Sequence, residues 1–243
     1  MGWEASIPAA VFPGRGHRGA GPAGAFRVEQ AINRLSGMLK KGTRRSPEER
    51  RQEIIDAALS LADTVGLDRI TSRDVANVLG VTSGLIHHYF PTVDDLVVAA
   101  FAQAAARQND LHRQALHELP PAEALTALVG RALAMGRGAA RVWMSAWVAA
   151  PRRPELAAEV DRRMLDGLDV LAEILRRGRA DGAFQLADPV VSALRILVLV
   201  DGVLVQMSMR ADTPYGDVHT LVWDSVEREV GMPGGSLRPA PAS

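Results

Sequence analysis

Cysteine is absent from this chain of 243 residues, which excludes disulfide bonds, thiolate zinc sites and cysteine nucleophiles and is consistent with a reducing compartment. Charge of one sign is also lacking, because 28 lysine and arginine residues balance 28 aspartate and glutamate residues. The whole molecule therefore has no field that would draw it to nucleic acid or to an anionic membrane. Any such attraction has to come from local clusters of charge.

A membrane-spanning run and a secretory signal are lacking as well. The longest apolar run, residues 193–209, is slightly short for a bilayer span and contains Arg195 and Asp201, so we interpret it as a buried helix. The N-terminal residues show no basic start, long apolar stretch or small-residue cleavage site. We therefore expect a cytoplasmic protein without a membrane partner.

The chain divides into four segments by composition and periodicity. Residues 1–46 are rich in glycine, proline, alanine and arginine without a sustained period, so we expect a disordered N-terminal extension that ends in a basic arm. Met38 is a candidate start of translation within it. Residues 47–93 and 94–231 show the apolar spacing of helices, and 232–243 are expected to form a disordered tail. With no alternating strand pattern, the predicted class is all-α: a three-helix N-terminal domain followed by a larger helical domain.

Residues 72–90 are expected to form two short helices joined by a tight turn. Val75 and Leu79 share a face four residues apart, and Ile86 completes a small apolar wedge beyond the turn. Gly80 supplies the permissive backbone that the turn needs. This is the spacing of a helix-turn-helix, in which the second helix lies in the major groove of DNA with its N-terminal residues toward the base edges.

The exposed positions of this motif are predicted to contact DNA. Small residues at the start of the second helix let the backbone approach the bases, and hydroxyl and guanidinium groups can reach phosphates or guanine. Basic residues before the first helix could follow phosphates as an arm, with a solvated tail as the alternative. The residues predicted in this way are Ser72, Arg73, Thr82, Ser83, Gly84, His87, His88, Tyr89, Lys40, Lys41 and Arg44.

The histidine pair, His87 and His88, raises the alternative of a metal site. Neighbouring residues on a helix point about 100° apart, and neither histidine has a ligand four residues away, so we favour groove contact over metal binding. Plain solvent exposure of one histidine stays open. The arginine pairs at 152–153 and 162–163 are interpreted as solvated faces.

The stretch "TSRDVANVLGVTSGLIHHYF" and its flanks, residues 51–101, resemble the DNA-binding domain of the TetR family of transcriptional regulators. Further along, "VWMSAWVAAPRRPEL" and "LVDGVLVQ" are similar to the BetI-like branch of that family. The family usually has a phosphate-contacting lysine near the start of its fourth helix, where this chain has Val93. The resemblance implies that the following residues lie at or near DNA: Ser72, Arg73, Thr82, Ser83, Gly84, Leu85, His87, His88 and Tyr89.

The resemblance also implies a C-terminal domain that binds a small molecule and forms a homodimer through its last two long helices. The helix expected at residues 188–210 is apolar nearly all round, so it must be covered on more than one side. A two-fold dimer would present its recognition helices to major grooves roughly 34 to 36 Å apart, which predicts an inverted-repeat operator. We expect the ligand to favour a spacing that no longer fits, transmitted through the helix at residues 94–119.

The predicted ligand-binding residues are Trp143, Met144, Trp147 and Asp201. Tryptophans four residues apart lie on one helical face, where they could stack on a flat ligand or form a cage for a quaternary ammonium group, with Asp201 as the nearby anion. Ordinary core packing of the tryptophans and an interface or capping role for Asp201 stay open. No cofactor or metal is expected.

The predicted function is therefore a homodimeric, ligand-responsive transcriptional regulator that represses from an inverted repeat. An enzyme with a helical pocket is the less favoured class, because the sequence shows no paired acid and base at a usable spacing, no nucleotide loop and no metal cluster. A helical partner-binding protein with weakened DNA binding is a further alternative, for which Val93 is the hint.

Overall fold

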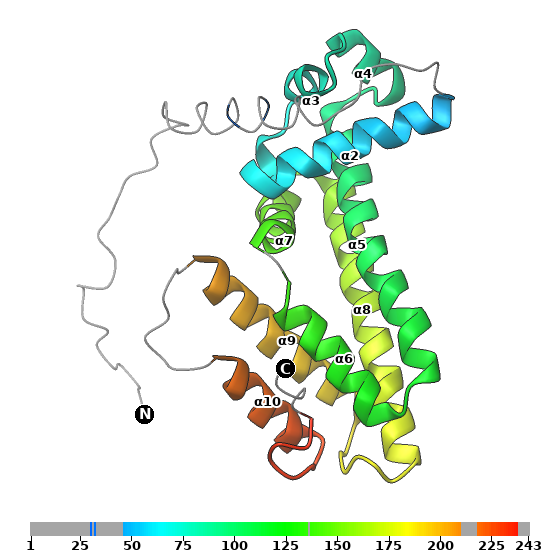
Figure 1. Cartoon of the computed structure of the whole chain (residues 1–243), viewed down its shortest axis with the longest axis vertical. Helices are drawn as coiled ribbons and strands as arrows, with labels where there is room; N and C mark the ends of the chain where they lie inside the picture. Colours follow the sequence, from blue (N-terminus) through cyan, green and yellow to red (C-terminus); the bar gives the residue numbers. More distant parts are fainter. Residues whose placement is uncertain (1–29, 31, 33–45, 136, 210–217, 238–243) are drawn as a thin grey trace, which may run out of the picture.

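The structure is a computed structural model that describes residues 30, 32, 46–135, 137–209 and 218–237. Within these residues the regular secondary structure is helical throughout, as the sequence predicts. Figure 1 shows a short cap of helices at one end of two long helices and a second group of helices at the other end. Of the expected disordered extension and basic arm, residues 1–46, the structure describes Gln30, Ile32 and Ser46. Gln30 and Ile32 are helical, and Ile32 packs against the first buried cluster, whereas Lys40, Lys41 and Arg44 lie outside the described residues.

The cap is formed by the segment that carries the predicted helix-turn-helix. Its first helix begins at a capping box in which the Ser46 hydroxyl accepts from the Glu49 N–H and the Glu49 carboxylate accepts from the Ser46 N–H. Thr71 caps the next α-helix by accepting from the Asp74 N–H at 3.2 Å. The helices of the cap are α2 (Pro47–Val65), η1 (Leu67–Arg69), α3 (Ser72–Leu79) and α4 (Ser83–Tyr89).

Two long helices connect the cap to the rest of the molecule, and a third, shorter helix lies beneath it. Helix α5 (Val93–Glu118) and helix α8 (Pro154–Ala180) pack against each other along the molecule. Helix α7 (Arg137–Ala149) contacts α2 and η1, and η2 (Ala150–Arg152) joins it to α8. The first buried cluster runs through the cap into α5, α7 and the start of α8, so the expected domain boundary at residues 93 and 94 does not separate two cores.

The far end of the molecule has its own buried cluster. Helices α6 (Pro121–Leu133), α9 (Pro189–Met209) and α10 (Val218–Glu229) pack with the C-terminal half of α8, and Trp223 is buried among them. Residues 232–237 differ from the expected disordered tail, because the Gly235 and Leu237 N–H groups both donate to the buried Glu227 carboxylate at 2.8 Å.

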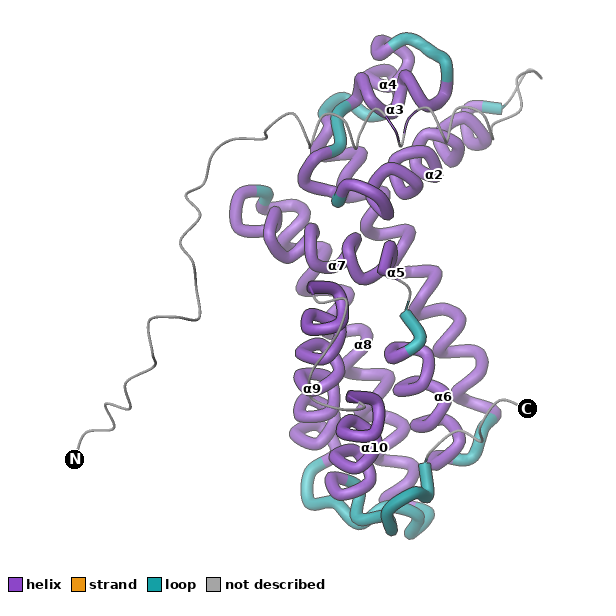
Figure 2. The backbone as a smooth tube through the Cα atoms, turned by 60° about the vertical axis from the view of Figure 1, so that its left-hand side comes forward, coloured by secondary structure: helices purple, strands orange, loops and turns teal. Residues whose placement is uncertain are grey.

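Helix α9 is less buried than its sequence predicts. It packs against α8 and α10 (Figure 2) and also contacts α7 and α6. Val190, Val191, Leu194 and Val198 on its outer side are 42–62% exposed. Its window Pro189–Gln206 has a mean hydropathy of 1.8, long and apolar enough to cross a membrane, and 28% of the window is buried. Within the single chain, the expectation of a buried helix therefore holds for the side with Ala193, Ile196 and Val203 and not for the opposite side.

Candidate nucleic-acid interface and ligand cavity

The two helices of the predicted motif are held together as the sequence suggests. Gly80 ends α3 in the left-handed conformation, with φ 66° and ψ 35°, and the next N–H, of Val81, donates to the Ala76 carbonyl at 3.0 Å. Val75 and Ile86 meet in the core with 0% and 1% exposure. The wedge therefore fixes α4 on α3 and leaves the opposite face of α4 outward.

The outward face of α4 carries most of the residues predicted to contact DNA. Thr82, Gly84, His87 and His88 are exposed, and Ser83, Leu85 and Tyr89 are partly exposed. Thr82 occupies the N-cap position of α4 but its hydroxyl forms no capping hydrogen bond, in contrast to Thr71 before α3. The Thr82 hydroxyl therefore remains available for a phosphate.

The aromatic side chains at the end of α4 have different surroundings. His87 Nδ1 donates to the Pro91 carbonyl at 3.3 Å, and the His87 side chain is exposed. The rings of His88 and Tyr89 meet edge to face with centroids 5.2 Å apart. Phe90 is 2% exposed and packs in the core, with the Arg51 guanidinium 4.8 Å above its ring.

Residues around the motif modify the predicted interface. Arg73 is exposed, but Ser72 is only 8% exposed, so the structure leaves it little surface for DNA. Val93, in place of the family's lysine, packs partly buried against the first core cluster. The adjacent Asp94 is paired with Arg153 at 3.1 Å, so one acid beside the motif is neutralised within the chain. Lys40, Lys41 and Arg44 lie outside the described residues.

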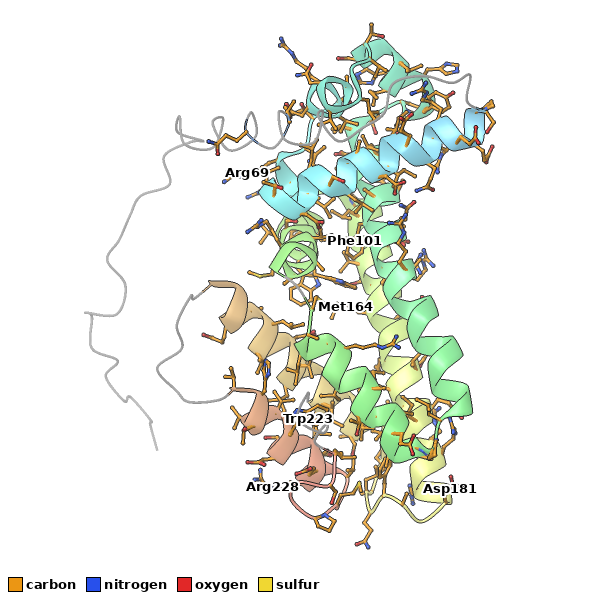
Figure 3. The ribbon with its side chains drawn as sticks, in the orientation of Figure 1. Arg69, Phe101, Met164, Asp181, Trp223 and Arg228 are labelled. Atoms are coloured by element: carbon orange, nitrogen blue, oxygen red, sulfur yellow. The ribbon has the colours of Figure 1, made fainter. Side chains whose placement is uncertain are left out.

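A cavity of about 120 Å³ lies between α6, α7, α8 and α9. All four residues predicted to bind a ligand line it: Trp143, Met144, Trp147 and Asp201. Figure 3 places Met164, another lining residue, below α7 at the level of the C-terminal end of α6. The helical spacing of the two tryptophans predicts that they lie on one face of α7. Their proximity to Asp201 follows only from the packing of the helices around the cavity.

The tryptophans of the cavity wall make edge-to-face aromatic contacts. The Trp143 ring lies 4.9 Å from Phe101 and 6.2 Å from Trp147, measured between centroids. Figure 3 shows Phe101 on α5 close to α7. Trp147 Nε1 is buried, and none of the described residues accepts its hydrogen. A buried donor without a partner favours a ligand that supplies an acceptor.

Two charged residues line the cavity among the described residues, Asp201 and Arg163. Burial raises the pKa of Asp201 to about 6, and no described residue forms a hydrogen bond or ion pair with its carboxylate. Arg163 is 14% exposed and donates to Glu159 at 2.8 Å, so the interpretation of residues 162–163 as a solvated face is wrong for Arg163. The same holds for Arg153, which is 20% exposed and paired with Asp94. The lining is otherwise almost entirely apolar.

Helix α7 connects this cavity directly to the cap. Ser145 Oγ accepts from the Leu67 N–H at 2.8 Å, and Arg141 Nη1 donates to the Asp63 carbonyl and, at 3.0 Å, to the Thr64 carbonyl at the C-terminal end of α2. These residues alternate along α7 with the cavity-lining Trp143 and Trp147. The sequence did not identify this connection, because it depends on residues that are 77 and 78 positions apart.

Family models match both halves of the chain. Residues 54–100 match the model described as "Bacterial regulatory proteins, tetR family", and residues 121–231 match that of the "BetI-type transcriptional repressor, C-terminal". The HTH-type transcriptional regulator BetI of Serratia proteamaculans (strain 568) is 27% identical over 169 residues, which cover 66% of this chain and 82% of that protein.

Solved structures show the same fold. A transcriptional regulator from Saccharomonospora viridis in complex with choline has a TM-score of 0.67 at 23% identity, covering 74% of this chain and 95% of that one. The multidrug binding protein EbrR complexed with proflavin has a TM-score of 0.53 at 26% identity, covering 74% of this chain and 99% of that one. The motif, the cavity and both family models lead to one conclusion: the chain is a transcriptional regulator of the tetR family, with a C-terminal half of the BetI type.

Proposed function

We propose that this regulator is a cytoplasmic homodimeric repressor that binds an inverted-repeat operator and leaves it when a small organic cation enters the cavity. Residues 47–93 serve as the DNA-binding domain, and 94–231 serve as the effector-binding and dimerisation domain. The observation that carries the proposal is the Asp201 carboxylate, which has no partner among the described residues and lies in an apolar cavity walled by two tryptophans.

DNA binding is supported by the composition of the α4 surface. Ser83 and Gly84 allow close approach to base edges, the imidazoles of His87 and His88 can donate or accept in the groove, and Thr82 and Tyr89 offer hydroxyl groups to phosphates. Arg73 adds a guanidinium beside them. A single short helix makes few contacts, so a dimer that presents two such helices is needed for a specific site.

A cationic effector is supported by the lining of the cavity. The two indole rings offer π-faces, and Asp201 supplies the anion that a buried cation requires. Choline and proflavin, named with two of the structural relatives, are both organic cations, which makes them suitable probes. The unpartnered Trp147 N–H would be satisfied by an acceptor on the same ligand, such as a hydroxyl oxygen.

We propose that helix α7 transmits ligand binding in the cavity to the DNA-binding cap. None of the described residues of α5 lines the cavity, whereas α7 contributes both tryptophans and also binds the end of α2 through Arg141 and Ser145. A ligand that shifts Trp143 or Trp147 therefore moves the helix on which α2 is anchored. This differs from the expectation that the helix at residues 94–119 transmits the signal. Helix α5 contributes less directly, through the contact of Phe101 with Trp143.

Fluorescence anisotropy with DNA from the region upstream of its own gene tests the proposal. We expect saturable binding to one inverted repeat at moderate salt, loss of that binding on addition of choline or proflavin, and no such loss for the Asp201→Asn variant. Binding that ignores inverted repeats would refute the repressor assignment. Specific binding that both cations leave unchanged would refute the effector class alone.

A further inference from the structure

Arg51 of α2 is an exposed cation that is held in place beside the helix-turn-helix. Its guanidinium lies 4.8 Å from the centroid of the Phe90 ring, and Phe90 is 2% exposed, so the ring is a rigid support. A guanidinium stacked on an aromatic face keeps its N–H donors at its edge, where they can still form hydrogen bonds. The stack therefore orients a charged group of the cap without using its donors.

No carboxylate among the described residues is paired with Arg51. The neighbouring Arg50 donates to Glu53, and both of these side chains are partly buried. Glu48, one turn earlier on α2, forms no ion pair with Arg51 in the described part of the chain. The positive charge of Arg51 is thus available to a partner outside the chain, whereas that of Arg50 is neutralised within it.

The stack places Arg51 at the junction between α4 and α5. Phe90 is the C-cap of α4, and Val93 begins α5 three residues later. Figure 1 shows α2 passing beneath α3 and α4 at the end of the molecule. The major groove is about 12 Å wide and an α-helix with its side chains about 10 to 12 Å, so a helix in the groove has phosphates along both flanks. A cation held at the end of α4 is therefore within reach of a phosphate.

The start of α5 itself offers no positive charge to that phosphate. Val93 packs partly buried against the first core cluster. Asp94 is paired with Arg153, and Asp95 accepts from the N–H of the Thr92 cap at 2.9 Å. A cation for this junction therefore has to come from a neighbouring helix, and Arg51 of α2 is placed there by its contact with Phe90.

We propose that Arg51 binds a phosphate of the operator backbone at the junction of α4 and α5, and that Phe90 positions it for this contact. The inference rests on the proposed operator binding and assigns to it a residue outside the helix-turn-helix. Phosphate contacts fix the register and orientation of a protein on the duplex without reading its sequence. Arg51 therefore helps to seat α4 in the groove, and the proposed dimer makes this contact twice.

The test compares Arg51→Ala with Arg50→Ala in the full chain. Fluorescence anisotropy gives the affinity for the operator and for unrelated duplex DNA of the same length at several salt concentrations. We expect Arg51→Ala to weaken binding to both by roughly tenfold, because a charge-assisted hydrogen bond is lost in each protomer. The slope of log affinity against log salt should fall by about two per dimer, one for each lost phosphate contact. Arg50→Ala removes an equal charge with an internal partner and should leave the slope unchanged.

Phe90→Leu tests the positioning role of the ring. Leucine keeps the buried position apolar but removes the aromatic face, and circular dichroism confirms that the variant is folded. Operator affinity should fall by about threefold, because the guanidinium loses its support. In the Arg51→Ala background the same substitution should cause no further loss, since the ring then has no guanidinium to hold.

The outcomes separate this inference from the proposed function. An unchanged salt slope for Arg51→Ala, or an equal loss of slope for Arg50→Ala, would overturn the phosphate contact while operator binding stands. Additive losses for Phe90→Leu and Arg51→Ala would overturn the positioning role of the ring. A natural chain that binds no inverted repeat would instead refute the proposed repressor and this inference together.

Discussion

Asp201 shows at the scale of one residue how a site can cost stability and provide function. Its pKa of about 6 in the folded chain lies above the ordinary value of 3.8, because burial disfavours the charged carboxylate. The folded chain therefore binds a proton more tightly than the unfolded one. The resulting stabilisation is present at low pH and is lost as the pH rises through about 6.

Replacing Asp201 with asparagine should raise the melting temperature above pH 6 and abolish the pH dependence contributed by this group. The reason is that a neutral amide avoids the free-energy cost of burying an ionised carboxylate. Differential scanning calorimetry at pH 5 and pH 7.5 measures the effect. A melting temperature lowered at both pH values would mean that the carboxylate has a structural partner after all.

Choline affinity should fall by roughly tenfold between pH 7.5 and pH 5, as the Asp201 carboxylate becomes protonated. Choline carries a permanent charge, so the ligand itself does not produce the change. Isothermal titration calorimetry provides the measurement. The Asp201→Asn variant is the control, and it should show weak binding without pH dependence.

Gly84 tests the close approach of α4 to DNA. An added Cβ would meet only the Thr82 hydroxyl, at 3.9 Å, so Gly84→Ala fits the folded chain and should stabilise it slightly. Operator affinity should nevertheless fall by about 1 to 3 kcal/mol, or roughly 5- to 150-fold, because the methyl group holds the helix away from the base edges. Fluorescence anisotropy measures it, with Gly130→Ala on α6 as a matched control that should leave affinity unchanged.

At the scale of elements, α7 forms a wall of the cavity and an anchor for the cap at once. Its Trp143 and Trp147 face the ligand side, whereas Arg141 and Ser145 hold the end of α2 and the start of η1. A rotation of α7 therefore changes the orientation of the cap. Helix α5 is joined to α2 through different side-chain contacts: Arg107 pairs with Asp56 at 2.9 Å, and Gln103 donates to Asp56 at 2.8 Å and accepts from Gln52 at 2.7 Å.

These two sets of contacts allow the routes to be separated by matched substitutions. Arg141→Ala should leave choline binding and operator binding nearly intact but weaken the coupling between them by about 0.5 to 2 kcal/mol, because the link from α7 to α2 is cut. Arg107→Ala combined with Gln103→Ala, which removes the side-chain contacts of α5 with Asp56 and Gln52 of α2, should leave the coupling unchanged. Operator titrations with and without saturating choline give both values, and the reverse pattern would assign the signal to α5.

The sequence allowed the helical class, the helix-turn-helix and the aromatic pair to be predicted, because each depends on spacing within one or two neighbouring helices. Val75 and Ile86 are buried, and Gly80 is left-handed, as their positions require. Features that depend on contacts between distant helices could not be predicted. The apolar pattern of α9 does not indicate which side the chain itself covers. The sequence also does not indicate that Arg163 lies in the lining of a cavity formed by four helices.

At the scale of the whole molecule, a net charge of zero means that the attraction to DNA has to be concentrated in local clusters. Arg73 lies beside the recognition helix, and the predicted arm adds Lys40 and Lys41. Exchanging both lysines for alanine should weaken binding to all sequences alike and reduce the slope of log affinity against log salt by about one for each lost phosphate contact, up to about four per dimer. Arg73→Ala should instead reduce the preference for the operator over other DNA. If the lysine substitutions changed sequence preference and left the salt slope intact, the arm would be a reader of bases rather than a source of general attraction.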